Sequence, residues 1–263
     1  HRKIFVIDGQ IAYTGSQNMV DPHFFKQNHG VGQWVDLMVR IKGPVVEAIG
    51  GTFISDWLLE TDPDPESGRS LQEDITQLRK VADILPVEKS GSVAVQLVPS
   101  GPGFVKDTIH SLLLTTIYAA RSEITLTTPY FVPDDSLLTA LQSASERGVK
   151  VRIVIPKNND SKLVEYASRA RFENLARAGV EIYLFEGGLL HSKTISIDND
   201  FSLFGSVNLD MRSFWLNFET TLFIYNKDFS KLLRDTQQDY IDQSQPLDLF
   251  LHITRPRFER FKE

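Results

Sequence analysis

The chain carries the same set of polar residues twice, and each member of the second set lies 190 positions after its counterpart in the first. The six matching pairs are His1/His191, Lys3/Lys193, Asp8/Asp198, Gly15/Gly205, Ser16/Ser206 and Asn18/Asn208. Since each residue type makes up roughly 5% of an average protein, six matches at one spacing indicate an internal repeat. The matching positions are polar side chains and glycine, so we expect one functional site built from two halves.

Each copy of the repeat is predicted to form a β-hairpin. Two apolar runs flank a turn in each copy, at residues 4–7 and 11–13 and again at 194–197 and 201–204. Asp8 and Gly9 suit the first of these turns. A further strand over residues 34–41 and a helix from Pro44 to about residue 59 follow the first hairpin.

Strands and helices alternate regularly from residue 92 onward. The predicted strands are residues 93–98, 123–128, 149–155 and 180–185, and the predicted helices are 104–120, 135–147 and 161–178. This alternation is typical of a β-sheet layered with helices. We therefore predict an α/β fold of two pseudo-repeated domains, each a mixed sheet covered by helices.

The repeat also predicts the domain boundaries. The first domain would cover residues 1–60 and the second residues 92–263, which end in a basic tail. A linker at 61–91 that begins acidic and proline-rich would join them. About 100 residues of strands and helices precede the second histidine, whereas nothing precedes the first. We therefore expect the first domain to be incomplete and the chain to be a piece of a longer product.

The amino-acid composition excludes only a few classes of function. The net charge of −6 argues against a protein that coats nucleic acid. The absence of cysteine excludes disulfides and thiolate metal sites. No apolar run reaches the roughly 18 residues that a membrane-spanning helix needs.

Two histidines, two lysines and two asparagines that converge on one point suit the chemistry of a phosphodiester. The lysine ammonium and asparagine amide groups can hold the phosphate oxygens and stabilise charge in the transition state. One imidazole can attack phosphorus to form a phosphohistidine, while the other protonates the leaving alcohol. The phosphate-binding candidates are Ser16, Asn18, Ser206 and Asn208, although the two serines could equally cap their loops.

Three groups of residues have other expected roles. Asp36 and Glu219 lie in apolar segments, 35 and 28 positions after His1 and His191, and we expect them to orient the imidazoles. Asp8 and Asp198 belong to the catalytic motif, but their place at a turn favours a structural role. The unrepeated histidines are interpreted as surface or packing residues: His23, His29, His110 and His252. Metal binding is disfavoured because two lysines would lie beside the ion.

The two complete motifs H-x-K-x4-D and G-S-x-N resemble those of the phospholipase D superfamily. Longer segments are similar to its bacterial cardiolipin synthases, at residues 13–22, 30–34, 128–133, 186–191 and 208–219. The resemblance spans nearly the whole chain and is closest to the long form with N-terminal membrane helices. It implies two phospholipase D-like domains and a location at the bacterial inner membrane, anchored by helices that this chain lacks.

The resemblance also implies a reaction and its partners. A histidine takes the phosphatidyl group from phosphatidylglycerol and releases glycerol, and a second phosphatidylglycerol then accepts the group to form cardiolipin. The motifs imply His1, Lys3, Asp8, His191, Lys193 and Asp198 as the catalytic set. We expect His1 to be the nucleophile and His191 the general acid and base, with no cofactor, no metal and no nucleic acid. The alternatives are a phospholipase or nuclease of the same superfamily, or a fragment without activity.

Overall fold

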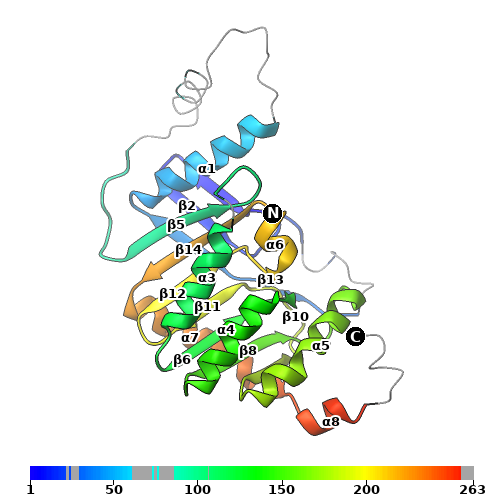
Figure 1. Cartoon of the computed structure of the whole chain (residues 1–263). Coiled ribbons are helices and arrows are strands. Elements are labelled where there is room, and N and C mark those ends of the chain that lie inside the picture. The colour runs from blue at the N-terminus through cyan, green and yellow to red at the C-terminus, as the bar shows by residue number, and fades with distance from the viewer. Residues whose placement is uncertain are drawn as a thin grey trace.

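The computed structural model describes residues 1–21, 24, 30–60, 73, 76, 86–105 and 107–255. Its largest element is an eight-stranded mixed β-sheet with strand order β15-β9-β8-β6-β11-β12-β14-β5 (Figure 1). The strands are β5 (Ala94–Ser100), β6 (Glu123–Thr127), β8 (Lys150–Pro156), β9 (Glu181–Phe185), β11 (Thr194–Ile197), β12 (Phe201–Gly205), β14 (Glu219–Tyr225) and β15 (Ser244–Pro246). Strands β6, β8 and β9 are parallel, whereas the other neighbours are antiparallel. This confirms the predicted α/β class.

Helices cover both faces of the sheet. One face packs against α3 (Thr108–Ala119), α4 (Asp135–Glu146) and α5 (Lys162–Arg177), whose apolar residues share one core with Ile195 and Ile197 of β11. The opposite face packs against α7 (Lys227–Asp242), where Gln237 bonds Ser196 and Thr194. Alternate side chains of β11 therefore point to opposite faces of the sheet, Ile195 and Ile197 to one helical layer and Thr194 and Ser196 to α7.

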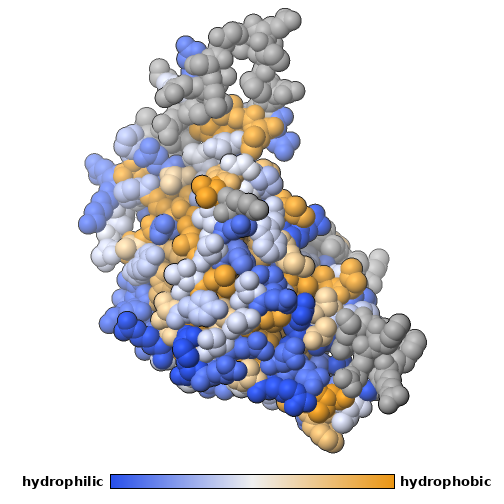
Figure 2. Space-filling view, in the orientation of Figure 1, coloured by the Kyte–Doolittle hydropathy of each residue, from blue (hydrophilic) through white to orange (hydrophobic). Residues whose placement is uncertain are grey.

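The N-terminal segment forms a small sheet with order β1-β2-β4. It contains the predicted hairpin of β1 (Ile4–Ile7) and β2 (Ile11–Gly15), followed by β4 (Met38–Lys42). Helix α1 (Val45–Glu60) packs on β1 and β4 and also on β5. The outer surface of α1 exposes large apolar side chains, which colour the upper part of Figure 2 orange; they are Phe53, Trp57 and Leu59.

The predicted single strand over residues 34–41 is wrong in one respect. The chain forms β3 (Trp34–Val35), leaves the strand conformation at Asp36 and Leu37, and only then enters β4. The break arises because β3 pairs with β10 (Leu189–Leu190) of the second half, whereas β4 pairs with β2. Asp36 therefore lies where the chain changes partner.

The two halves are joined by an apolar contact as well as by the β3–β10 pair. Leu37, Val39 and Ile41 of the first half pack against a buried cluster of the second half that contains Phe204 and Leu222. These three side chains are partly buried, so each contributes less than the roughly 1.5–3 kcal/mol of a fully buried apolar side chain. The halves of the repeat consequently share a core, and the residues that separate β3 from β4 lie against the second half.

Some predictions meet the structure only in part. The helix predicted at 104–120 begins later, at Thr108, because Asp107 directly before it adopts a left-handed conformation with φ of 60°. Most of the predicted linker, residues 61–91, and residues 256–263 at the end of the basic tail lie outside the described residues. Within the described part of the chain, no helix is both long and apolar enough to cross a membrane.

Candidate active site

Each H-x-K motif places its lysine in the same way. His1 and Lys3 lead into β1, and His191 and Lys193 lead from β10 into β11. Lys193 Nζ donates to the backbone carbonyl of His191 at 2.5 Å, and Lys3 Nζ donates to the carbonyl of His1. Both lysines are buried, so the spacing of two residues folds each ammonium back toward the histidine beside it.

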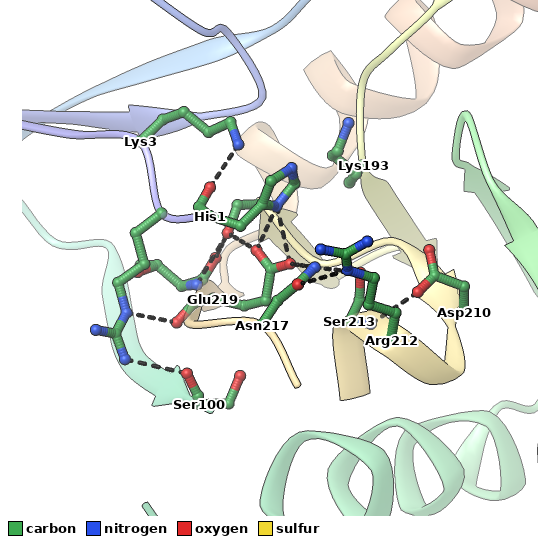
Figure 3. Close-up of polar contacts among 12 residues, drawn as sticks. His1, Lys3, Ser100, Lys193, Asp210, Arg212, Ser213, Asn217 and Glu219 are labelled. Atoms are coloured by element: carbon green, nitrogen blue, oxygen red, sulfur yellow. Dashed lines mark hydrogen bonds and ion pairs between the residues drawn. The ribbon is translucent and has the colours of Figure 1, made fainter. Parts of the chain in front are cut away.

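The two imidazoles are held by carboxylates that come from the opposite halves of the repeat. His1 Nδ1 lies 2.9 Å and 3.0 Å from the two carboxylate oxygens of Glu219, as Figure 3 shows. His191 Nδ1 lies 2.6 Å from Asp36 Oδ1. The positions of these carboxylates along the chain did not indicate this crossing. Each histidine depends on the other half of the molecule for its orientation.

Strand register explains why Asp36 and Glu219 have the same role despite different sequence spacings. Gly15 of the first motif pairs with Met38, and Gly205 of the second pairs with Thr221. Each carboxylate lies two residues before the partner of its motif glycine. The two residues are therefore structural equivalents, and a longer loop in the first copy hides the match in the sequence.

The motif glycines allow the backbone to approach this neighbouring strand closely. A Cβ atom at Gly205 would lie 2.1 Å from the carbonyl oxygen of Thr220, and one at Gly15 would lie 2.2 Å from that of Leu37. No larger residue fits at these distances. The approach brings the serine that follows each glycine against the carboxylate.

The two motif serines hold the carboxylates. Ser16 Oγ donates to Asp36 Oδ1 and Ser206 Oγ donates to Glu219 Oε2, both at 2.6 Å. Each serine oxygen also accepts from the adjacent strand, from Leu37 N and Thr220 N at 3.0 Å. This differs from the predicted phosphate contact, because both buried hydroxyls already have partners inside the protein.

The motif asparagines remain candidates for contact with phosphate. Asn208 is buried, and its side-chain oxygen has no hydrogen-bond partner among the described residues. Phosphate oxygens accept hydrogen bonds, so they would bond the amide nitrogen of each asparagine, whereas the unpartnered oxygen of Asn208 needs a donor such as a substrate hydroxyl or water. Asn18, its counterpart, is half-buried.

The motif aspartates lie at the far end of the hairpins from the lysines. Asp198 accepts hydrogen bonds from the backbone amides of Arg121, Ser122 and Glu123, at 2.8–3.3 Å. These bonds outweigh its partial burial and lower the pKa of its carboxyl group. The turn position and these contacts support the structural role that is expected for Asp198. Asp8 is exposed at the equivalent turn, with the same φ of 51°.

Burial sets the protonation of the basic groups. Burial, reinforced by the charge of Lys193, lowers the pKa of His191 to about 4, against the opposing effect of Asp36. Burial likewise lowers the pKa of Lys3 to about 8, and the opposing attraction of Glu219 and Asp36 offsets this shift only in part. The pKa of the fully buried Lys193 falls well below its usual value, first through burial and then through repulsion by Lys3. The site thus holds a neutral His191 and two lysines whose charged forms are disfavoured by burial and would be favoured again by a bound anion.

The two carboxylates differ in their environments. Burial raises the pKa of Glu219, against hydrogen bonds from Ser206 and Asn217. Burial acts in the same direction on Asp36, but hydrogen bonds from His191 and Ser16 outweigh it and lower the pKa of this group. The two imidazole–carboxylate pairs are therefore similar in geometry and distinct in electrostatics.

Sequence reasoning missed several residues of the site. Arg2 donates to the carbonyls of Glu219 and Ser100 at 2.9 Å and 3.0 Å and pairs with Asp56. Asn217 Nδ2 donates to Glu219 Oε1 at 3.1 Å. The ring of Trp34 lies 4.5 Å from that of His191. None of the three repeats at the constant spacing, so the repeat could not identify them.

Two of the unrepeated histidines have packing roles, as interpreted from the sequence. His110 Nε2 lies 3.0 Å from Asp134 Oδ1, beside the rings of Phe214 and Trp215. His252 packs near the ring of Phe172. His23 and His29 lie outside the described residues. In the part of the chain that the structure describes, no three metal-ligating side chains cluster together.

The sequence of the chain is similar to those of known proteins. Residues 113–240 match the family model described as "Cardiolipin synthase, PLD-like domain". Cardiolipin synthase A of Cronobacter sakazakii is 50% identical over 268 residues, which cover 100% of this chain and 52% of that protein. The chain therefore spans about half the length of the curated relatives that it matches.

Solved structures share the fold. The phosphatidylserine synthase of Haemophilus influenzae superposes with a TM-score of 0.67 at 17% identity, covering 99% of this chain and 67% of that one. NUC, a phospholipase D family member from Salmonella typhimurium, has a TM-score of 0.52 at 24% identity. It covers 59% of this chain and 99% of its own. The full-length match supports the interpretation of the chain as two repeated halves.

Proposed function

Because the chain belongs to the phospholipase D superfamily and carries the PLD-like domain of cardiolipin synthases, we propose that it transfers a phosphatidyl group between two phosphatidylglycerol molecules. The products are cardiolipin and glycerol. The observation that carries this proposal is the pair of imidazoles, each held at Nδ1 by a buried or half-buried carboxylate. Two matched imidazoles suit a reaction whose leaving group and attacking group are both alcohols.

In the proposed first step, His1 attacks phosphorus. A carboxylate only accepts hydrogen bonds when ionised, so Glu219 keeps the His1 proton on Nδ1 and leaves a lone pair on Nε2. The new Nε2–P bond forms as the bond from phosphorus to the glycerol oxygen breaks. A proton from His191 neutralises the departing glycerol alkoxide.

His191 must gain its proton before it can act as an acid. Its pKa of about 4 in the free site makes it neutral near pH 7. An anionic phosphodiester beside the ring favours the imidazolium, which the Asp36 carboxylate also stabilises at Nδ1. Proton uptake therefore accompanies substrate binding in this scheme.

In the second step, the phosphoryl group leaves His1 for the hydroxyl of a second phosphatidylglycerol, by the reverse of the first step. His191, neutral after it has given up its proton, removes the proton from a hydroxyl of the second phosphatidylglycerol. That oxygen attacks phosphorus and displaces His1, which recovers its free Nε2. Lys3 and Lys193, with Asn18 and Asn208, stabilise the phosphoryl oxygens in both steps. Both substrates are bilayer lipids, so we infer that the enzyme works at a membrane surface.

The test is incubation of the purified protein with vesicles of phosphatidylglycerol. We expect one glycerol for each cardiolipin, and no product from the His191→Asn variant under the same conditions. Phosphatidic acid in place of cardiolipin would instead identify a hydrolase of the same superfamily. The absence of any lipid product from a folded sample would refute the proposal.

A further inference from the structure

Arg212 is a cation at the active site that the proposed chemical steps do not use. It lies in the short helix α6 (Met211–Trp215), which follows the motif residue Asn208. Figure 3 shows its guanidinium beside Asn217, which lies next to the Glu219 carboxylate. The side chain is exposed, whereas Lys3 and Lys193 are buried. Arg212 therefore lies at the outer side of the site.

The position of Arg212 is held through the active-site network. Its Nε donates to Asn217 Oδ1 at 3.3 Å, and the amide nitrogen of Asn217 donates to Glu219 Oε1 at 3.1 Å. One amide thus separates the guanidinium from the carboxylate that holds His1. The two terminal nitrogens of Arg212 have no protein partner among the described residues, so four N–H groups are available to a ligand.

The repeat supplies no second cation of this kind. At the constant spacing, the first copy carries Pro22 where the second carries Arg212. Arg2, the other arginine near Glu219, is buried and already paired with Asp56. The charge at the outer side of the site is therefore asymmetric, although the imidazoles and lysines are matched. Such an asymmetry can distinguish two substrates that take turns in one site.

We propose that Arg212 binds the phosphate of the acceptor lipid during the second step. This inference rests on the proposed function. The acceptor brings a phosphodiester that stays intact, a few bonds from its attacking hydroxyl, and this group cannot occupy the two-lysine site, which already holds the transferred phosphoryl group. A guanidinium with two free terminal nitrogens suits a phosphate better than a point charge does. Arg212 thereby favours an anionic acceptor over a neutral alcohol or water.

A competition experiment isolates the second step. Phosphatidylglycerol vesicles are incubated with the enzyme and a short primary alcohol, so that both acceptors draw on one phosphohistidine intermediate. The measurement is the ratio of cardiolipin to phosphatidyl-alcohol for wild type, Arg212→Gln and Arg212→Lys. We expect Arg212→Gln to lower this ratio by about tenfold or more, the loss of one charge-assisted contact. Arg212→Lys should fall between the two.

Arg177→Gln is the matched control, because Arg177 is an exposed arginine on α5 that pairs with Glu173. It should leave the ratio at the wild-type value. An unchanged ratio in Arg212→Gln, even with a lower total rate, would overturn the inference and assign Arg212 to the support of Glu219. If wild type itself formed only phosphatidyl-alcohol and phosphatidic acid, the proposed function would fail, and the inference with it. Failure of the inference would thus appear only in Arg212→Gln, whereas failure of the proposed function would appear already in the wild-type protein.

Discussion

The guanidinium of Arg2 donates to the backbone carbonyl of Glu219, the residue whose carboxylate holds His1. The same side chain donates to the carbonyl of Ser100 and lies between the rings of Phe104 and Phe218, with its carbon 4.9 Å and 5.2 Å from their centroids. Arg2 therefore fixes the segment before β1, which contains His1, against β14 and β5, and we expect the distance between His1 and Glu219 to depend on it.

Replacing Arg2 with Met should lower kcat by about tenfold or more and destabilise the fold by about 3 kcal/mol, since two carbonyls and Asp56 lose a buried partner. Asp56→Asn is the matched variant and should cost less, because Arg2 keeps both carbonyls and both rings. Chemical denaturation and steady-state kinetics measure the two effects. Equal kcat in Arg2→Met and wild type would show that Arg2 does not position His1.

The two histidines should behave differently in adduct trapping. With a phosphatidyl donor that has a good leaving group, His191→Asn should form the adduct slowly and accumulate it, because the second step lacks its base. His1→Asn should form no adduct, since the covalent route is removed. Mapping of the labelled peptide decides the assignment. Label on the peptide that contains His191, in the His1→Asn background, would reverse the two roles.

The efficiency of the enzyme should fall as pH rises through about 8. Lys3 has a pKa of about 8 in the free site, and only its protonated form attracts the anionic lipid. The profile of kcat/KM against pH should therefore decline on this alkaline side. Lys3→Arg, which keeps its charge, should move the decline to higher pH even if its maximum is lower. A decline at the same pH in both proteins would assign it to another group.

Folding stability should fall between pH 6.5 and about 4 because of His191. Its pKa is lower in the folded than in the unfolded protein, so the unfolded chain binds a proton in this range that the folded chain excludes. The penalty is absent above pH 6.5 and reaches about 3 kcal/mol below pH 4. Denaturant unfolding of wild type and His191→Asn across this range measures it. Parallel stability profiles for the two proteins would contradict the shift.

The repeat predicted much of the fold and of the site because it pairs residues at one spacing. It identified both hairpins, both H-x-K motifs and the glycine–serine pairs that the structure brings to the carboxylates. Asp36 and Glu219 were found only because a carboxylate in an apolar segment needs a partner. Their equivalence appears in the strand register, which a sequence with loops of unequal length does not display.

Other features depended on contacts between distant segments. The break between β3 and β4 follows from pairing with β10, which lies far along the chain. The contacts of Arg2 with Asp56, Ser100 and Glu219 join segments that lie far apart in the chain. No local sequence pattern predicts that an arginine is buried. The role of the two serines also needed the structure, because a hydroxyl beside a loop can bond phosphate or protein equally well.

Each half of the repeat supplies the carboxylate that orients the histidine of the other half, so the reaction requires the two halves to be packed together correctly. A molecule in which Leu37 shifts relative to the apolar cluster around Phe204 would lose the partners of both imidazoles at once, even with each half folded. Such a molecule would lack an oriented nucleophile as well as an oriented acid. Under the proposed mechanism, misassembly would therefore yield an inert protein and not one that carries out the first step alone.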